Sequence, residues 1–154
     1  QDHPDRRFVF GYEQALGYLV AGQPLDKDGI TAAVLFAEIA AVAAAEGRTL
    51  QGWLDDIAER YGRHVLADAS VRMSPAEARA RVLELRSSPP HSIGGRAVRS
   101  TEEYPEADLL RFELEGGVRV QIRPSGTEPK VKLYGEAIDE DPAPFVDALA
   151  ALLA

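Results

Sequence analysis

The stretch "RPSGTEPKVKLY" concentrates cationic and hydroxyl side chains around one glycine within residues 123–134. Five of these residues are the candidate anion-binding residues: Arg123, Ser125, Gly126, Thr127 and Lys132. A guanidinium binds two phosphate oxygens at once, and an ammonium supplies a point charge. Hydroxyls and the backbone amides of a glycine turn add further donors. These residue types and their spacing predict a binding site for a phosphate monoester.

Alternating polarity predicts a strand on each side of this loop. Apolar and polar residues alternate over 118–123 and again over 130–134. Residues two positions apart share a sheet face, so we expect Arg123 and Lys132 to point away from the core. The two prolines beside the glycine restrict the loop and reduce the entropy lost on binding. The residues alone leave one alternative open, a proline-glycine hairpin whose cations are only solvated.

Three helices are predicted upstream of this hairpin. Asp28, Thr49 and Ser74 are suited to accept the free amides of a first helical turn. The helices that they start should end near residues 46, 62 and 86. The first helix is apolar on most sides, so we expect it to be buried between layers. Residues 8–22 are expected to be the end of a strand, a glycine-marked loop and a short mixed segment. Loose alternation over 64–73 indicates a strand that leads out of this first region.

The period changes from helical to two after the loop predicted at residues 87–95. Strands are predicted at 96–102, 108–115, 118–123 and 131–138, with a tight turn at Gly116-Gly117. A last helix follows Asp141-Pro142, and its apolar residues should face the sheet: Phe145, Val146, Leu149, Leu152 and Leu153. This order predicts an α+β domain, a four-stranded antiparallel sheet with helices on one face.

Composition narrows the class of protein. The formal net charge is -8 over 154 residues, which argues against a nucleic-acid partner because such binding needs a basic surface. The longest apolar stretch is rich in alanine and interrupted by Glu38, so we expect no membrane span. The sequence contains no cysteine, and its polar start lacks the apolar run of a signal segment, so we expect a protein of the reducing cytoplasm.

The first region looks incomplete. A strand end and two helices cannot bury their own apolar surface, including Trp53. The chain begins at Gln1, and Met73 is its only methionine. We therefore expect the chain to be the C-terminal part of a longer protein, whose N-terminal domains would be its partners.

Two motifs resemble a known family. "RPSGTEP", followed by a basic residue and "LY", is similar to the phosphate-binding loop of the α-D-phosphohexomutases, the phosphoglucomutases and phosphomannomutases. "FGYEQALGY" resembles the sugar-recognition loop that closes their third domain, and "DKDGITAAVLFAEIAA" resembles the segment after it. The resemblance implies that residues 1–68 end the third domain and that residues 69–154 form the TBP-like fourth domain.

The resemblance also implies an activity and roles for residues. These enzymes exchange a phosphoryl group between the anomeric oxygen and the terminal hydroxyl of a sugar phosphate, through a sugar 1,6-bisphosphate that turns end over end. The five loop residues would hold the phosphate that is not reacting. Glu13 would accept hydrogen bonds from two adjacent sugar hydroxyls, and Lys27 would contact the substrate near the transferring end. A surface cation at a helix start is the alternative for Lys27.

Two motifs of the family do not occur in this sequence, the phosphoserine loop and the "DGDGDR"-type magnesium loop. The resemblance therefore implies that Mg²⁺ binds outside these residues and that the chain alone is inactive. It further implies a lid motion of the fourth domain about a hinge near residues 64–74. Ala15 stands where many relatives have serine, so glucose, mannose and pentose phosphates all stay open as substrates. A phosphopentomutase and a non-catalytic phosphate-binding module remain the alternatives.

Overall fold

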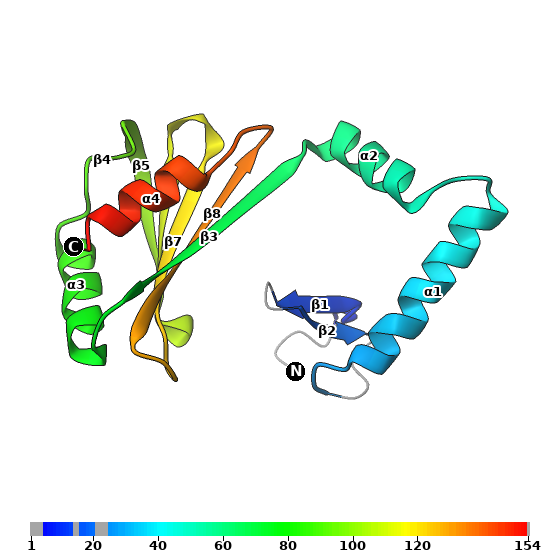
Figure 1. Cartoon of the computed structure of the whole chain (residues 1–154), viewed down its shortest axis with the longest axis horizontal. Helices are drawn as coiled ribbons and strands as arrows, with labels where there is room; N and C mark the ends of the chain where they lie inside the picture. Colours follow the sequence, from blue (N-terminus) through cyan, green and yellow to red (C-terminus); the bar gives the residue numbers. More distant parts are fainter. Residues whose placement is uncertain (1–4, 14–15, 21–24, 154) are drawn as a thin grey trace. The chain divides into compact units, whose positions relative to one another are not determined.

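The computed structural model describes residues 5–13, 16–20 and 25–153 (Figure 1). The chain divides into two compact units, Gln1–Ile57 and Ala58–Ala154.

The N-terminal unit contains a β-hairpin where the sequence predicts a strand end and a loop. Strands β1 (Phe10–Glu13) and β2 (Gly17–Val20) pair antiparallel, and Glu13 stands opposite Gly17. The turn depends on Leu16, which has a φ of 61° and donates its amide to the carbonyl of Glu13 at 3.1 Å. Leucine seldom adopts this left-handed conformation, so no local signal predicts the hairpin. Ala15 lies outside the described residues.

Helix α1 (Gly29–Ala45) begins as predicted. The carboxylate of Asp28 accepts the amides of Ile30 and Thr31 at 3.2 and 2.9 Å. The amide of Thr31 is the main reason that the pKa of Asp28 lies below its ordinary value. The expected burial between layers is not found among the described residues: Ile30 is 77% exposed, and Ala43 is the one buried residue of the helix.

The other two predicted caps are confirmed. Thr49 Oγ1 accepts the amide of Gly52 at 3.0 Å before α2 (Leu50–Tyr61). Ser74 and Glu77 form a capping box at the start of α3 (Pro75–Ser87). Within the described chain, no single helix is long and apolar enough to cross a membrane; α1 and α2 meet the same criteria only when joined across a sharp bend.

The C-terminal unit is built on a six-stranded antiparallel sheet. Its strands, in spatial order, are β3 (His64–Arg72), β8 (Lys130–Ile138), β7 (Arg119–Pro124), β6 (Leu109–Leu114), β5 (Arg96–Tyr104) and β4 (Ser92–Ile93). The predicted α+β class is confirmed, but the sheet has two more strands than predicted. The short strand β4 lies inside the stretch predicted as a loop.

Strand β3 is the larger addition. It pairs with β8 along its whole length, from His64 opposite Ile138 to Arg72 opposite Lys130. The expected boundary between residues 68 and 69 therefore falls inside a paired strand. The hinge expected near residues 64–74 falls on the same strand, whose backbone is held by the ladder of β8.

Helices α3 and α4 (Ala143–Ala151) cover one face of this sheet (Figure 1). One core joins them to the sheet, and its largest fully buried side chains include Phe112, Ile122, Leu133 and Leu149. Four of the five residues predicted to face the sheet from the last helix are buried. Leu152, the C-cap residue of α4, is the exception, at 42% exposed.

Short turns complete the unit. The predicted Gly116-Gly117 turn is confirmed, and both glycines have a φ near 80° in the short helix η2 (Glu115–Gly117). A second 3-10 turn, η1 (Pro105–Ala107), connects β5 to β6. The other face of the sheet carries no helix among the described residues of this unit.

Candidate functional site

The two candidate phosphate-binding cations are brought together by strand register. Arg123 on β7 stands directly opposite Lys132 on β8, and Lys132 in turn stands opposite Ser70 on β3. Their neighbours Ile122 and Leu133 are fully buried on the helix-covered face. As predicted from the alternation, Arg123 and Lys132 therefore lie on the open face of the sheet.

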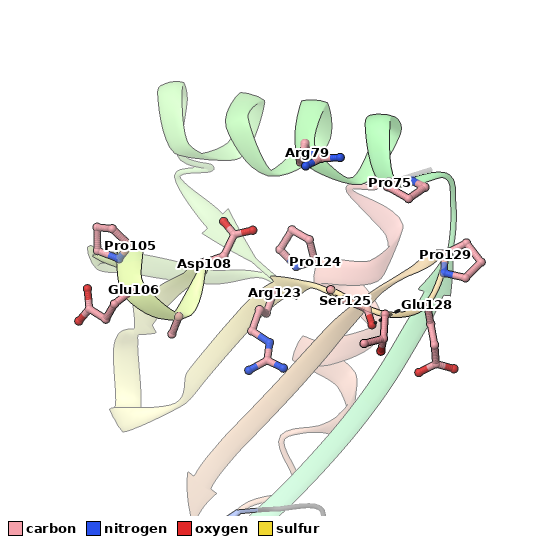
Figure 2. Close-up of a pocket in the computed structure, with 13 residues that line it drawn as sticks. Pro75, Arg79, Pro105, Glu106, Asp108, Arg123, Pro124, Ser125, Glu128 and Pro129 are labelled. Carbon is pink, nitrogen blue, oxygen red and sulfur yellow. Dashed lines mark hydrogen bonds between the residues drawn. The ribbon is translucent and has the colours of Figure 1, made fainter.

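The loop between these strands, residues 125–129, is closed by its own hydrogen bonds. The amide of Ser125 donates to the carbonyl of Lys130 at 2.9 Å, and the amide of Lys130 donates to the carbonyl of Glu128 at 2.8 Å. The amide of Glu128 donates to Ser125 Oγ at 3.2 Å, the dashed line in Figure 2. Because this oxygen accepts, the hydroxyl proton of Ser125 stays available as a donor toward solvent.

We expected the backbone of the turn to require glycine at position 126, and the conformation of Gly126 does not bear this out. Its φ is not in the left-handed region, and a Cβ built on it would meet nothing within 4 Å. Among the hydrogen bonds of the described residues, none uses the amide of Gly126 or that of Thr127. Two adjacent amide donors are therefore left without a hydrogen-bond partner in the described residues, with no side chain at 126 beside them.

A pocket of about 560 Å³ adjoins the loop (Figure 2). Residues 123–129 form one wall, and the others come from the start of α3 and from residues 105–108. Arg79 of α3 is a lining residue that sequence reasoning missed, since nothing local links a helix residue to a loop more than forty positions later. In Figure 2, Arg79 lies on the helix while Arg123 projects from β7 away from it. Lys132 is not among the lining residues.

The pairing of charges explains how an acidic chain keeps a cationic loop. Near the middle of the sheet, Arg111 Nε and Arg119 Nε approach the carboxylate of Glu113 at 3.1 and 3.4 Å. In the ion pairs of the described residues, neither Arg123 nor Lys132 takes part. Positive charge is thus neutralised in the centre of the open face and retained at the loop end.

Lys130 is different from Lys132. Its Nζ lies 2.8 Å from Glu128 Oε2, and this hydrogen bond from Lys130 is the main reason that the pKa of Glu128 is lowered. The carboxylate neutralises Lys130 locally. Lys132, two residues along the same strand, is left as the cation available to a ligand.

The two candidate sugar-binding residues also meet, within the N-terminal unit. Lys27 Nζ lies 3.3 Å from Glu13 Oε1, and both side chains are about half exposed. Glu13 ends β1, while Lys27 precedes the cap of α1. The pair leaves Glu13 Oε2 and two ammonium protons of Lys27 for other partners.

The part of the chain that the structure describes holds no group of three or more histidine or carboxylate side chains suited to a metal ion.

Comparison with known proteins supports the resemblance that the loop motif indicates. A probable phosphomannomutase of Haemophilus influenzae is 38% identical over 140 residues, covering 87% of this chain and 29% of the relative. A phosphoglucomutase of Staphylococcus epidermidis is 29% identical over 153 residues, covering 85% of this chain and 28% of the relative. The chain thus spans less than a third of the length of these relatives. The family model described as "Phosphoglucomutase/phosphomannomutase, C-terminal domain" matches residues 20–143, and the chain belongs to that family.

Proposed function

We propose that this chain is the substrate-binding C-terminal part of a phosphohexomutase, an isomerase that interconverts a sugar 1-phosphate and a sugar 6-phosphate. The family and the names of the relatives support this class of enzyme. The observation that carries the role of this chain is the loop end of the open face. There, Arg123 and Lys132 stand side by side without carboxylate partners in the described residues, next to two unused amides.

In this proposal the loop holds the phosphate that is not reacting. Arg123 grips two of its oxygens, and Lys132 supplies charge from the neighbouring strand. The amides of Gly126 and Thr127 and the hydroxyls of Ser125 and Thr127 donate to the same oxygens. A hydrogen bond to a charged group contributes about 1.5–3 kcal/mol. Three or four such bonds are enough for binding of micromolar order after the association cost is subtracted.

Glu13 and Lys27 are proposed to contact the sugar. A carboxylate accepts two hydroxyl donors at once, which suits adjacent hydroxyls of a pyranose. Because the bisphosphate must bind in both orientations, recognition has to rest on hydroxyls that look alike from either end. We propose the sugar 1,6-bisphosphate as the intermediate and activator of the reaction.

The chemistry itself is proposed to depend on the rest of a longer polypeptide. The family's phosphoserine and magnesium loops are expected there, so Mg²⁺ would be held outside the residues of this chain. The N-terminal domains would also be the physical partner of the first unit, where Val34 and Phe36 of α1 are 64% and 60% exposed. We place this enzyme in the cytoplasm, without nucleic-acid or membrane partners, in keeping with a chain that has no cysteine.

Calorimetric titration of the chain tests the binding role. Glucose 6-phosphate, mannose 6-phosphate and ribose 5-phosphate are titrated in turn, because the sugar is not identified. Arg123→Ala should weaken binding of the preferred ligand at least about tenfold, the loss of one charged hydrogen bond. Arg99→Ala is the matched control, since it removes an exposed arginine that pairs with Glu115 on the same sheet. Equal affinity of the two variants would remove the loop from the proposal.

A coupled assay tests the division of labour. The chain alone should show no mutase turnover with glucose 1-phosphate and its 1,6-bisphosphate. Joined to the N-terminal part of its polypeptide, it should turn over, and Arg123→Ala should then raise KM for the sugar phosphate. Turnover by the chain alone would contradict the proposal. Binding without turnover in the joined protein would instead support the phosphate-binding module.

A further inference from the structure

Gly17 lies beneath the ion pair of Glu13 and Lys27. It stands opposite Glu13 in the β1–β2 ladder. A Cβ built on Gly17 would lie 2.3 Å from Lys27 Cδ, 3.1 Å from Lys27 Cγ and 3.3 Å from Glu13 Oε2. The methylenes of Lys27 therefore occupy the space where any other residue would place its side chain.

The backbone of Lys27 is held so that its side chain has to cross β2. The next residue, Asp28, donates its amide to the carbonyl of Tyr18 at 2.9 Å, which ties this segment to β2. Asp28 also caps α1 through its carboxylate. On the other side, the amide of Lys27 donates to Asp26 Oδ1 at 2.7 Å. With its main chain anchored beside Tyr18, Lys27 reaches Glu13 by passing over position 17.

We infer that Gly17 is a positioning residue: by lacking a side chain, it lets Lys27 reach Glu13 and join it in one receptor for the sugar phosphate. This inference rests on the proposed function and deepens its sugar-binding part. The backbone conformation does not explain the glycine, since the φ of Gly17 is outside the left-handed region. Space alone distinguishes glycine from alanine there.

The Glu13–Lys27 pair offers both a hydrogen-bond acceptor and hydrogen-bond donors to a ligand. Glu13 Oε2, the oxygen that does not pair with Lys27, can accept a sugar hydroxyl, and the free ammonium protons of Lys27 can donate to an anionic or ether oxygen. A ligand that offers a hydroxyl donor close to such an oxygen satisfies both groups. A sugar phosphate does this with its ring hydroxyls, which inorganic phosphate lacks.

Gly11 provides a matched control in the same hairpin. A Cβ there would meet the ring of Phe8 at 3.4 Å, an ordinary contact, and its φ is likewise outside the left-handed region. Gly17→Ala and Gly11→Ala therefore make the same chemical change on neighbouring strands. They differ in whether the new methyl group occupies the path of Lys27.

The first test needs no ligand. Lys27, Lys130 and Lys132 are the three lysines of the sequence, so labelling lysine with ¹³C at Cε gives three side-chain signals. Gly17→Ala should move the Lys27 signal toward that of a free lysine and leave the other two in place. Gly11→Ala should move none of them. A Lys27 signal unchanged by Gly17→Ala would overturn the inference.

The second test is a double-mutant cycle, read by titration with glucose 6-phosphate. Gly17→Ala and Lys27→Ala should each weaken binding by about tenfold, and the double variant should bind no worse than Lys27→Ala alone. An additional loss in the double variant would show that Gly17 acts otherwise and would overturn the inference. If even the parent chain binds no sugar phosphate, the proposed function fails, and the lysine signals still decide whether Gly17 positions Lys27.

Discussion

Arg123 and Lys132 face each other across the β7–β8 ladder, on the open face of the sheet. Like charges directly opposite one another are destabilising in an antiparallel pair. In the described residues, neither side chain forms an ion pair with a carboxylate, whereas Arg119, at the start of β7, lies 3.1 Å from Glu136. The loop end of the sheet thus holds a repulsion that a bound dianion would relieve.

Replacement of Lys132 should affect the melting temperature of the ligand-free protein little but reduce its stabilisation by phosphate. Lys132→Gln removes the repulsion with Arg123, so the melting temperature without phosphate should stay the same or rise slightly. The rise in Tm on adding inorganic phosphate, measured against chloride at equal ionic strength, should largely disappear. Lys130→Gln is the control because Lys130 is neutralised by Glu128. A full phosphate response in Lys132→Gln would contradict the proposed site.

Gly126→Ala should leave the fold intact and impair the site. The new methyl group has open space and an ordinary φ, so the free energy of unfolding should change by no more than about 0.5 kcal/mol. Phosphate affinity should fall, because the methyl group would stand beside the two unused amides. Urea denaturation and calorimetric titration measure the two effects. Unchanged affinity would mean that the amides of Gly126 and Thr127 take no part in binding.

Gly135→Ala, unlike Gly126→Ala, should destabilise the fold. A Cβ on Gly135 would lie 2.5 Å from Val146 Cγ2 and 3.1 Å from Pro142 Cβ, where α4 packs on β8. Overpacking of this kind costs about 1–3 kcal/mol, which should appear as a lower urea midpoint for the C-terminal unit. Gly126→Ala is the matched control, because its new methyl group meets nothing within 4 Å. A midpoint equal to that of the control would show that α4 moves aside at little cost.

The Lys130–Glu128 pair should respond to acid. The hydrogen bond from Lys130 lowers the pKa of Glu128 below its ordinary value of 4.5. A lowered pKa in the folded state stabilises the fold above the ordinary value, and this contribution disappears as the pH falls through the folded pKa. Lys130→Met should therefore raise the pKa of Glu128, measured from the carboxyl ¹³C shift between pH 2 and 6. A Glu128 titration that does not move in this variant would show that Lys130 does not hold the carboxylate.

Local patterns were sufficient for much of the C-terminal unit. Alternation through Ile122 and Leu133 predicted which side of the hairpin is buried, because a strand has only two faces. Asp28, Thr49 and Ser74 predicted where helices begin, because a cap acts on amides two or three residues away. The resemblance carried by "RPSGTEP" is likewise contiguous in the chain, and the family match agrees with it.

The sequence by itself therefore determined the α+β class, the helix starts, the family and the open-face position of Arg123 and Lys132. Only the tertiary structure decided that β3 joins the sheet beside β8, that Arg79 lines the pocket, and that Lys27 passes over Gly17. The physical reason is the separation along the chain of the residues that interact. Capping and alternation act between residues a few positions apart, whereas strand pairing, pocket walls and close side-chain approaches join distant segments whose contact no local pattern specifies.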